Sequence, residues 1–186
     1  MKRLNGIADV EEAGDGFKRP EAGGYVCRIT DVEDNPDKEY LKIEYDFAEG
    51  EFKDYFRDLN DKKGFWGGSF IKSYKKKAWP FFKGFCTAVT ESNKGFIFDG
   101  DEHADERTLK NKLIGLVIGE EDYIKGDGSL GSRLYVAQTL SVDRIRKGDY
   151  KVPEYKHLQD TGSSSGSSDD YVAPVYDSDE SELPFR

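Results

Sequence analysis

Basic and aromatic side chains are concentrated between Phe52 and Phe85, in a pattern typical of surfaces that hold nucleic acid. These 34 residues carry nine Lys or Arg against three Asp, a net charge of +6, whereas the whole 186-residue chain carries −9. Eleven of the 25 aromatic residues lie in the same stretch. Cations neutralise phosphates, and flat rings stack with bases of any type. The stretch therefore predicts sequence-tolerant binding of single strands.

Seven side chains in or beside this stretch are the candidates for direct contact. The three rings at polar or loop positions are expected to stack with bases: Tyr55, Trp66 and Trp79. Four cations are expected to neutralise phosphates: Arg57, Lys72, Lys75 and Lys76. Affinity should then fall with salt, with a log–log slope of about −0.7 for each phosphate contact to a single strand.

A purely structural interpretation of the same residues competes with this one. Five rings fit a single apolar stripe and are expected in the core: Phe70, Tyr74, Phe81, Phe82 and Phe85. The run of lysines at 75–77 is also compatible with a solvated helix face. Its charge contrast with the rest of the chain is what keeps the binding interpretation open.

The main alternative that involves catalysis is a nuclease built on an acidic loop. A divalent metal for phosphodiester cleavage would need its carboxylates and imidazole: Asp99, Asp101, Glu102, His103 and Asp105. Their spacing matches no closed ligand pattern, so a solvated loop is the favoured interpretation. The chain has only two histidines and no glycine loop that leads into a helix to hold phosphate. We therefore expect no catalytic residue, no metal and no cofactor.

Composition limits the class of protein further. The length fits one domain with a tail, and an isoelectric point near 4.9 restricts nucleic-acid binding to a local patch. Cys27 and Cys86 lie in separate apolar neighbourhoods, which favours buried free thiols in a reducing compartment. No apolar run approaches the roughly 20 residues of a membrane helix, and the N-terminus lacks a secretion signal. A soluble cytoplasmic protein without a membrane partner is expected.

Alternation of apolar and polar residues predicts most of the secondary structure as strands. Three strands joined by short turns are expected as an antiparallel meander at 22–32, 40–47 and 51–59. Two more are expected at 109–124 and 133–145, with a hairpin connection between them.

A helical connection is expected between the third and fourth strands. Apolar residues recur at helical spacing from Phe70 to Val89, and Pro80 must interrupt the helix or begin a second one. Three strands, a helix and two strands form the connectivity of an OB-fold, a mainly β five-stranded antiparallel barrel whose exposed face binds single strands.

Three regions follow from these expectations. Residues 1–20 form an N-terminal arm and residues 21–158 the OB-fold domain. Residues 159–186 form an acidic, Ser/Gly-rich tail that is expected to be disordered, because it cannot bury enough apolar area to fold.

The tail and two internal segments resemble known single-stranded DNA-binding proteins. Residues 177–185 resemble the acidic tip of the bacterial proteins, although Arg186 follows the Pro-Phe pair here. Residues 70–85 and 113–150 are similar to a phage-encoded family of such proteins found with Gram-positive hosts. The resemblance implies a non-enzymatic role in phage replication or recombination, in the cytoplasm of the bacterial host. It also implies partner binding by the tail residues Asp179, Glu180, Glu182, Leu183, Pro184 and Phe185.

The favoured hypothesis is therefore a homo-oligomeric single-stranded DNA-binding protein of unknown subunit number. Its tail would recruit replication or recombination proteins and compete with DNA for the basic surface. The alternative is an adaptor of a replication complex that binds proteins and does not touch DNA.

Overall fold

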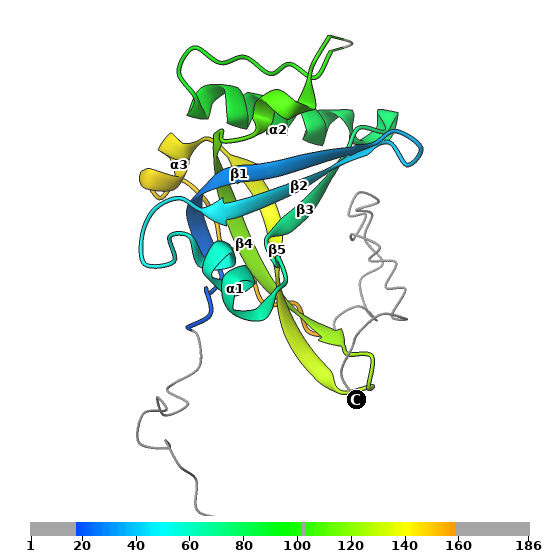
Figure 1. Cartoon of the computed structure of the whole chain (residues 1–186), viewed down its shortest axis with the longest axis vertical. Helices are drawn as coiled ribbons and strands as arrows, with labels where there is room; N and C mark the ends of the chain where they lie inside the picture. The colour runs from blue at the N-terminus through cyan, green and yellow to red at the C-terminus, as the bar shows by residue number, and fades with distance from the viewer. Residues whose placement is uncertain (1–17, 102, 159–186) are drawn as a thin grey trace, which may run out of the picture.

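A five-stranded antiparallel sheet forms the body of the molecule (Figure 1). The structure is a computed structural model, and it describes residues 18–101 and 103–158. Most of the N-terminal arm and the whole tail expected at 159–186, with its partner-binding residues 179–185, lie outside the described residues.

The strands follow the order β3-β2-β1-β4-β5, and every neighbouring pair is antiparallel. Their bounds are β1 (Gly23–Asn35), β2 (Tyr40–Phe47), β3 (Ser69–Ser73), β4 (Leu113–Ile124) and β5 (Leu130–Leu140). The expectation of a mainly β chain with five antiparallel strands is confirmed. Within the described residues no ladder joins β3 to β5, so the closed barrel is not seen.

Helices lie around the sheet, and in the chain they precede and follow β3 (Figure 1). Their bounds are α1 (Tyr55–Lys63), the short 3-10 helix η2 (Lys76–Ala78), α2 (Trp79–Ser92), the 3-10 helix η3 (Glu106–Leu109) and α3 (Val142–Arg146). The helix α2 lies across the top of the sheet in Figure 1, and the β4–β5 hairpin extends from the opposite end. The helix α2 lies between β3 and β4 in the chain, as expected for the helical connection.

The third strand was expected at 51–59, and that expectation is wrong. Residues 55–63 form α1, and the strand that pairs with β2 is β3, with Phe70 opposite Ile43. The apolar residues Phe52 and Phe56 stand four apart, a spacing that fits both a strand and a helix. The burial of Leu59, three residues after Phe56, belongs to the helical pattern.

The helix expected from residue 70 begins later for the same reason. Phe70 and Tyr74 also stand four apart, but β3 continues to Ser73 and α2 starts only at Trp79. Pro80 occupies the first turn of α2, where its missing N–H costs no hydrogen bond. The fifth strand also ends earlier than expected, at Leu140, and residues 142–146 form α3.

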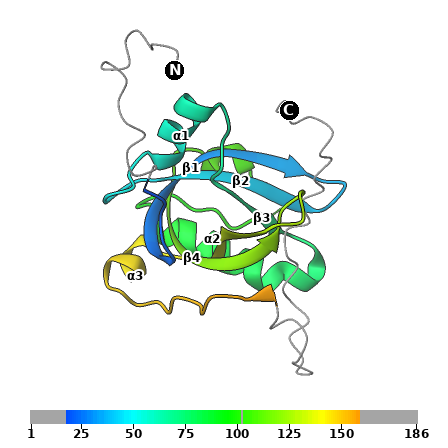
Figure 2. The same cartoon turned by 90° about the horizontal axis from the view of Figure 1, so that it is seen from below.

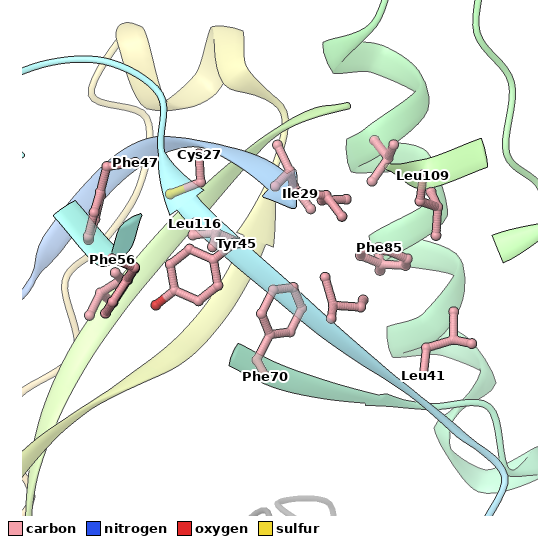
Figure 3. Close-up of a cluster of buried hydrophobic side chains, with 14 of the residues drawn as sticks. Cys27, Ile29, Leu41, Tyr45, Phe47, Phe56, Phe70, Phe85, Leu109 and Leu116 are labelled. Carbon is pink, nitrogen blue, oxygen red and sulfur yellow. The ribbon is translucent and has the colours of Figure 1, made fainter. Parts of the chain in front are cut away.

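The core lies between the inner face of the sheet and the helices (Figure 3). Phe47 stacks with Phe56 of α1 at a centroid distance of 5.5 Å, and Phe85 of α2 has no exposed surface. Burial of each such side chain contributes about 1.5–3 kcal/mol. A smaller cluster on the other face joins α3 to β1 and β4 through Val26, Val117, Val142 and Ile145.

Both cysteines are free and buried, as expected. Cys27 of β1 is completely buried, and burial raises the pKa of the Cys86 thiol to about 11. Neither thiol is therefore poised to react at neutral pH.

Candidate nucleic-acid interface

The structure divides the seven candidate side chains between the two ends of β3. Tyr55, Arg57 and Trp66 precede the strand, and Lys75, Lys76 and Trp79 follow it. Ser69 to Ser73 span about 13 Å at about 3.3 Å per residue. Only Lys72 lies within the strand. The basic and aromatic stretch is thus divided along the chain into a part before β3 and a part after it.

The two rings near α1 are partly used by the core. Trp66 is half-buried, its indole Nε1 donates a hydrogen bond to the Gly68 carbonyl at 2.9 Å, and its ring lies 6.2 Å from that of Phe56. Tyr55 is also half-buried, with its ring 6.2 Å from that of Phe47, and burial raises its pKa. Each ring therefore offers less surface to a base than an exposed one.

Arg57 already has carboxylate partners. Its guanidinium lies 3.1 Å from the Asp54 carboxylate and 3.8 Å from that of Asp58. A phosphate would have to compete with both carboxylates for this exposed cation. The α1 end is therefore the weaker of the two candidate surfaces.

The segment that leads into α2 carries exposed cations and exposed rings close together along the chain. Trp79 is 58% exposed and Phe81 is 56% exposed. Four lysines beside them are exposed, and none forms an ion pair with another described residue. We call this surface the α2 patch: Lys75, Lys76, Lys77, Trp79, Phe81 and Lys83. Residues 69–90 contain five lysines and no acidic residue, so the patch is uniformly positive along the chain.

Backbone and side-chain hydrogen bonds hold the α2 patch in place. The Tyr74 amide donates to the Glu39 carbonyl at 2.9 Å, which ties the end of β3 to the β1–β2 hairpin. The Trp79 indole Nε1 donates to the Tyr74 carbonyl, also at 2.9 Å. Because the N–H of Trp79 is satisfied internally, its exposed ring is oriented while it stays open to a stacking partner.

Phe81 was expected in the core, and the structure contradicts this. The buried side of α2 carries Phe82, Phe85, Cys86 and Val89, which are spaced as one helical stripe. Phe81 precedes that stripe by one position, about 100° around the helix, and so faces solvent. Once the helix is known to begin at Trp79, the sequence shows which of its positions face the core and which face solvent. The expected core positions of Phe70 and Phe85 are confirmed.

Lys72 is a different kind of cation from the lysines of the α2 patch. It lies opposite Leu41 of β2, on the same side of β3 as Phe70, and its Nζ is 5.8 Å from the Phe70 ring centroid. Burial lowers the pKa of Lys72 to about 8. No carboxylate of the described chain forms an ion pair with it. An anion that reached Lys72 would stabilise its charged form.

The acidic loop does not gather its side chains around one point. The Asp105 carboxylate receives two hydrogen bonds from the Arg107 guanidinium, which lower its pKa. Across residues 18–101 and 103–158, no three potential metal ligands lie close enough to hold one ion. Glu102 lies outside the described residues.

No protein-family model matches the chain, and no curated protein matches it. The resemblance of the tail tip and of residues 70–85 and 113–150 to single-stranded DNA-binding proteins therefore stays a hypothesis. In the described part of the chain, no helix combines the length and the apolar character that a membrane crossing requires.

Proposed function

We propose that this protein binds single-stranded DNA through the α2 patch and catalyses no reaction. The observation that carries the proposal is the exposure of Trp79 and Phe81 among four lysines that lack ion-pair partners within the described chain. In a protein of net charge −9, such a surface is a local exception. Its two residue types are the ones that single-strand binding requires.

Each part of the α2 patch has a role in this mechanism. Trp79 and Phe81 stand about 200° apart around α2, so each ring stacks with a separate base, which is worth about 1–3 kcal/mol per base. The lysines hold the phosphates that flank those bases. The first turn of α2 carries no acidic residue that would repel the phosphates. Stacking does not select among bases, so sequence preference is weak.

The fold supports the same proposal at the level of analogy. The strand order β3-β2-β1-β4-β5 is the order that an OB barrel gives when it is opened between its third and fifth strands. We place the chain in this architecture as a partly open barrel, with α2 as the helical connection. Fold alone does not fix function, so the α2 patch remains the main argument.

The wider role proposed for the protein is in phage DNA replication or recombination, in the bacterial cytoplasm. The tail, with Leu183, Pro184 and Phe185 at its end, would recruit the partner proteins. Exposed tryptophan and phenylalanine side chains also suit a protein partner, which keeps the adaptor as the second candidate. Only the adaptor predicts that single-stranded DNA leaves the α2 patch untouched.

Fluorescence titration tests the proposal directly. Trp66→Phe leaves Trp79 as the only tryptophan, so its quenching reports on the α2 patch alone. Poly(dT) should quench it saturably at low salt, duplex DNA should not, and added salt should reverse the effect. The double charge reversal Lys75→Glu/Lys76→Glu should weaken binding strongly. The matched control is Lys94→Glu/Lys147→Glu, because both lysines are exposed and lie outside the α2 patch.

Two results would reject the proposal. If poly(dT) leaves the Trp79 signal unchanged and causes no mobility shift, the α2 patch does not bind DNA, and the adaptor becomes the better hypothesis. If poly(dT) binds with the same affinity after charge reversal, DNA uses another surface.

A further inference from the structure

The segment after α3 forms a second surface with cations and a ring. It returns along the outer half of β4 (Figure 2, orange). The Lys156 amide donates to the Glu120 carbonyl at 3.1 Å, and the Asp122 amide donates to the Lys156 carbonyl at 2.9 Å. Glu121 and Lys156 form a parallel bridge. These bonds fix Lys156 beside β4.

A hollow of about 220 Å³ opens between this segment and β5. Its lining residues include two lysines, an aromatic ring and an amide, and no acid: Tyr135, Ala137, Gln138, Lys151, Pro153 and Lys156. The volume is below the roughly 300–1,000 Å³ typical of drug-sized ligands. It suits a single small polar group better than an extended apolar molecule.

A glycine makes room for the floor of the hollow. A Cβ placed on Gly119 would lie 2.6 Å from Cζ of Tyr135 and 2.7 Å from Cγ of Pro153. Real Cβ atoms do not come this close to other heavy atoms. Tyr135 and Pro153 can therefore approach β4 this closely only because position 119 has no side chain.

A β-bulge in β5 lies at the side of the hollow. Gln138 pairs with Val117 and Val136 pairs with Ile118, so Ala137 is an extra residue in the ladder. Bulges of this kind redirect neighbouring side chains and recur next to binding sites. Gln138 is exposed at this point and offers both a donor and an acceptor.

The cations of the hollow are placed for an anion. Lys156 Nζ lies 4.2 Å from the Tyr135 ring centroid, so a positive charge stands over the ring. Lys151 is exposed, and no ion pair joins it to another residue of the described chain. With two ammonium groups, a ring edge and an amide, the lining matches the chemistry of a phosphate with its attached nucleoside.

We propose that this hollow is a second subsite, which takes one phosphate and the adjoining part of its nucleoside from the DNA strand that binds the α2 patch. The inference rests on the proposed function, because it assigns a further part of the same strand. It concerns different elements: the α2 patch follows β3, whereas the hollow lies on β5 and on residues 151–156.

Oligomer length separates the two sites. In the Trp66→Phe chain, thymidine oligomers of about 4 and about 16 nucleotides span the usual range for one OB-fold. We expect Lys151→Gln to reduce the salt slope by about 0.7 for the long oligomer and to leave the short one unchanged, because the short oligomer occupies the α2 patch alone. Lys147→Gln, an exposed lysine outside the hollow, is the matched control and should change neither slope.

Amide chemical shifts give a second, independent readout. The long oligomer should shift the amide resonances of Gly119 and Ala137 saturably, in step with the quenching of Trp79. If Trp79 is quenched while these amides stay fixed and Lys151→Gln leaves the salt slope unchanged, the subsite is rejected and the proposed function stands. If Trp79 is not quenched and no DNA binds, both fail together.

Discussion

The Asp46 carboxylate on β2 accepts a hydrogen bond from the Phe56 amide at 2.9 Å, so a strand residue caps the helix α1. The same carboxylate accepts the amides of Phe47 at 2.9 Å and Arg57 at 3.0 Å. Asp54, at the N-cap position itself, makes no side-chain cap hydrogen bond and has a positive φ of 61°. Burial raises the pKa of Asp46, although its three amide donors act to lower it.

Removing this carboxylate should destabilise the fold. Asp46→Ala leaves buried amides without an acceptor, so we expect a loss of about 1–3 kcal/mol in the free energy of unfolding. Urea denaturation measures it. Asp58→Ala, which removes an exposed carboxylate from the same helix, should cost less than about 1 kcal/mol. Equal losses in the two variants would show that Asp46 does not act as a cap.

Trp79 and Phe81 should matter for binding and not for stability. Trp79→Ala and Phe81→Ala should each weaken binding to poly(dT) by about 1–3 kcal/mol, which is about 5- to 150-fold. Because both rings are more than half exposed, unfolding should change little. Phe65→Ala is the control, since Phe65 is 54% exposed at the other end of β3. A loss of affinity as large in Phe65→Ala would place the DNA at the α1 end.

Lys72 should make stability depend on pH. Burial lowers its pKa to about 8 from 10.5, so between these values the unfolded chain holds more protons, and stability should rise with pH across this window. Below pH 8 the half-buried ammonium is charged, at a cost on the order of 3 kcal/mol. Lys72→Met should therefore stabilise the protein at pH 7 and flatten the rise. Urea denaturation at pH 7 and at about pH 10 tests this.

A control and a contrary outcome complete the test of Lys72. Lys75→Met removes an exposed lysine two residues after β3 and should leave the pH dependence as it is. If the slope between pH 8 and 10.5 survives in Lys72→Met, another group causes it.

Replacing Gly68 and Gly84 by alanine should change the stability of the protein in opposite directions. A Cβ on Gly68 would lie 2.3 Å from the Tyr45 carbonyl oxygen and 2.4 Å from the Phe56 ring, so Gly68→Ala should be strongly destabilising. A Cβ on Gly84, inside α2, would meet nothing within 4 Å. Gly84→Ala should therefore stabilise the protein by about 0.5–1 kcal/mol. Thermal unfolding of both variants measures the two signs, and a destabilising Gly84→Ala would contradict the helical assignment.

The sequence predicted an element correctly where the spacing of its apolar residues fitted only a strand or only a helix. β2 was expected at 40–47 and has those bounds, because its alternation is unbroken over eight residues. The assignments from 51 to 78 failed because apolar residues four apart satisfy both a strand and a helix. Pairing supplied the missing information: Phe70 lies opposite Ile43, which only a strand allows.

The candidate site was predicted in part. Trp79, Lys75 and Lys76 were named from the sequence and lie on the exposed α2 patch, whereas Phe81 was assigned to the core. The exposure of Phe81 depends on the residue at which α2 begins. Local sequence patterns predict that residue only to within a few positions. The cap from Asp46 to α1 spans ten positions and two elements, so no capping rule based on neighbouring residues could have found it.

The pairing of β1 with β4 also governs when the molecule can fold. Gly23 lies opposite Ile118, whereas the β1–β2 hairpin closes within a few residues. Contacts between distant positions form slowly, because a long loop must be closed before they contribute. The α2 patch is encoded inside that loop. During synthesis it therefore leaves the ribosome before β4 and β5, against which α2 packs, so α2 completes its packing only after both strands have been made.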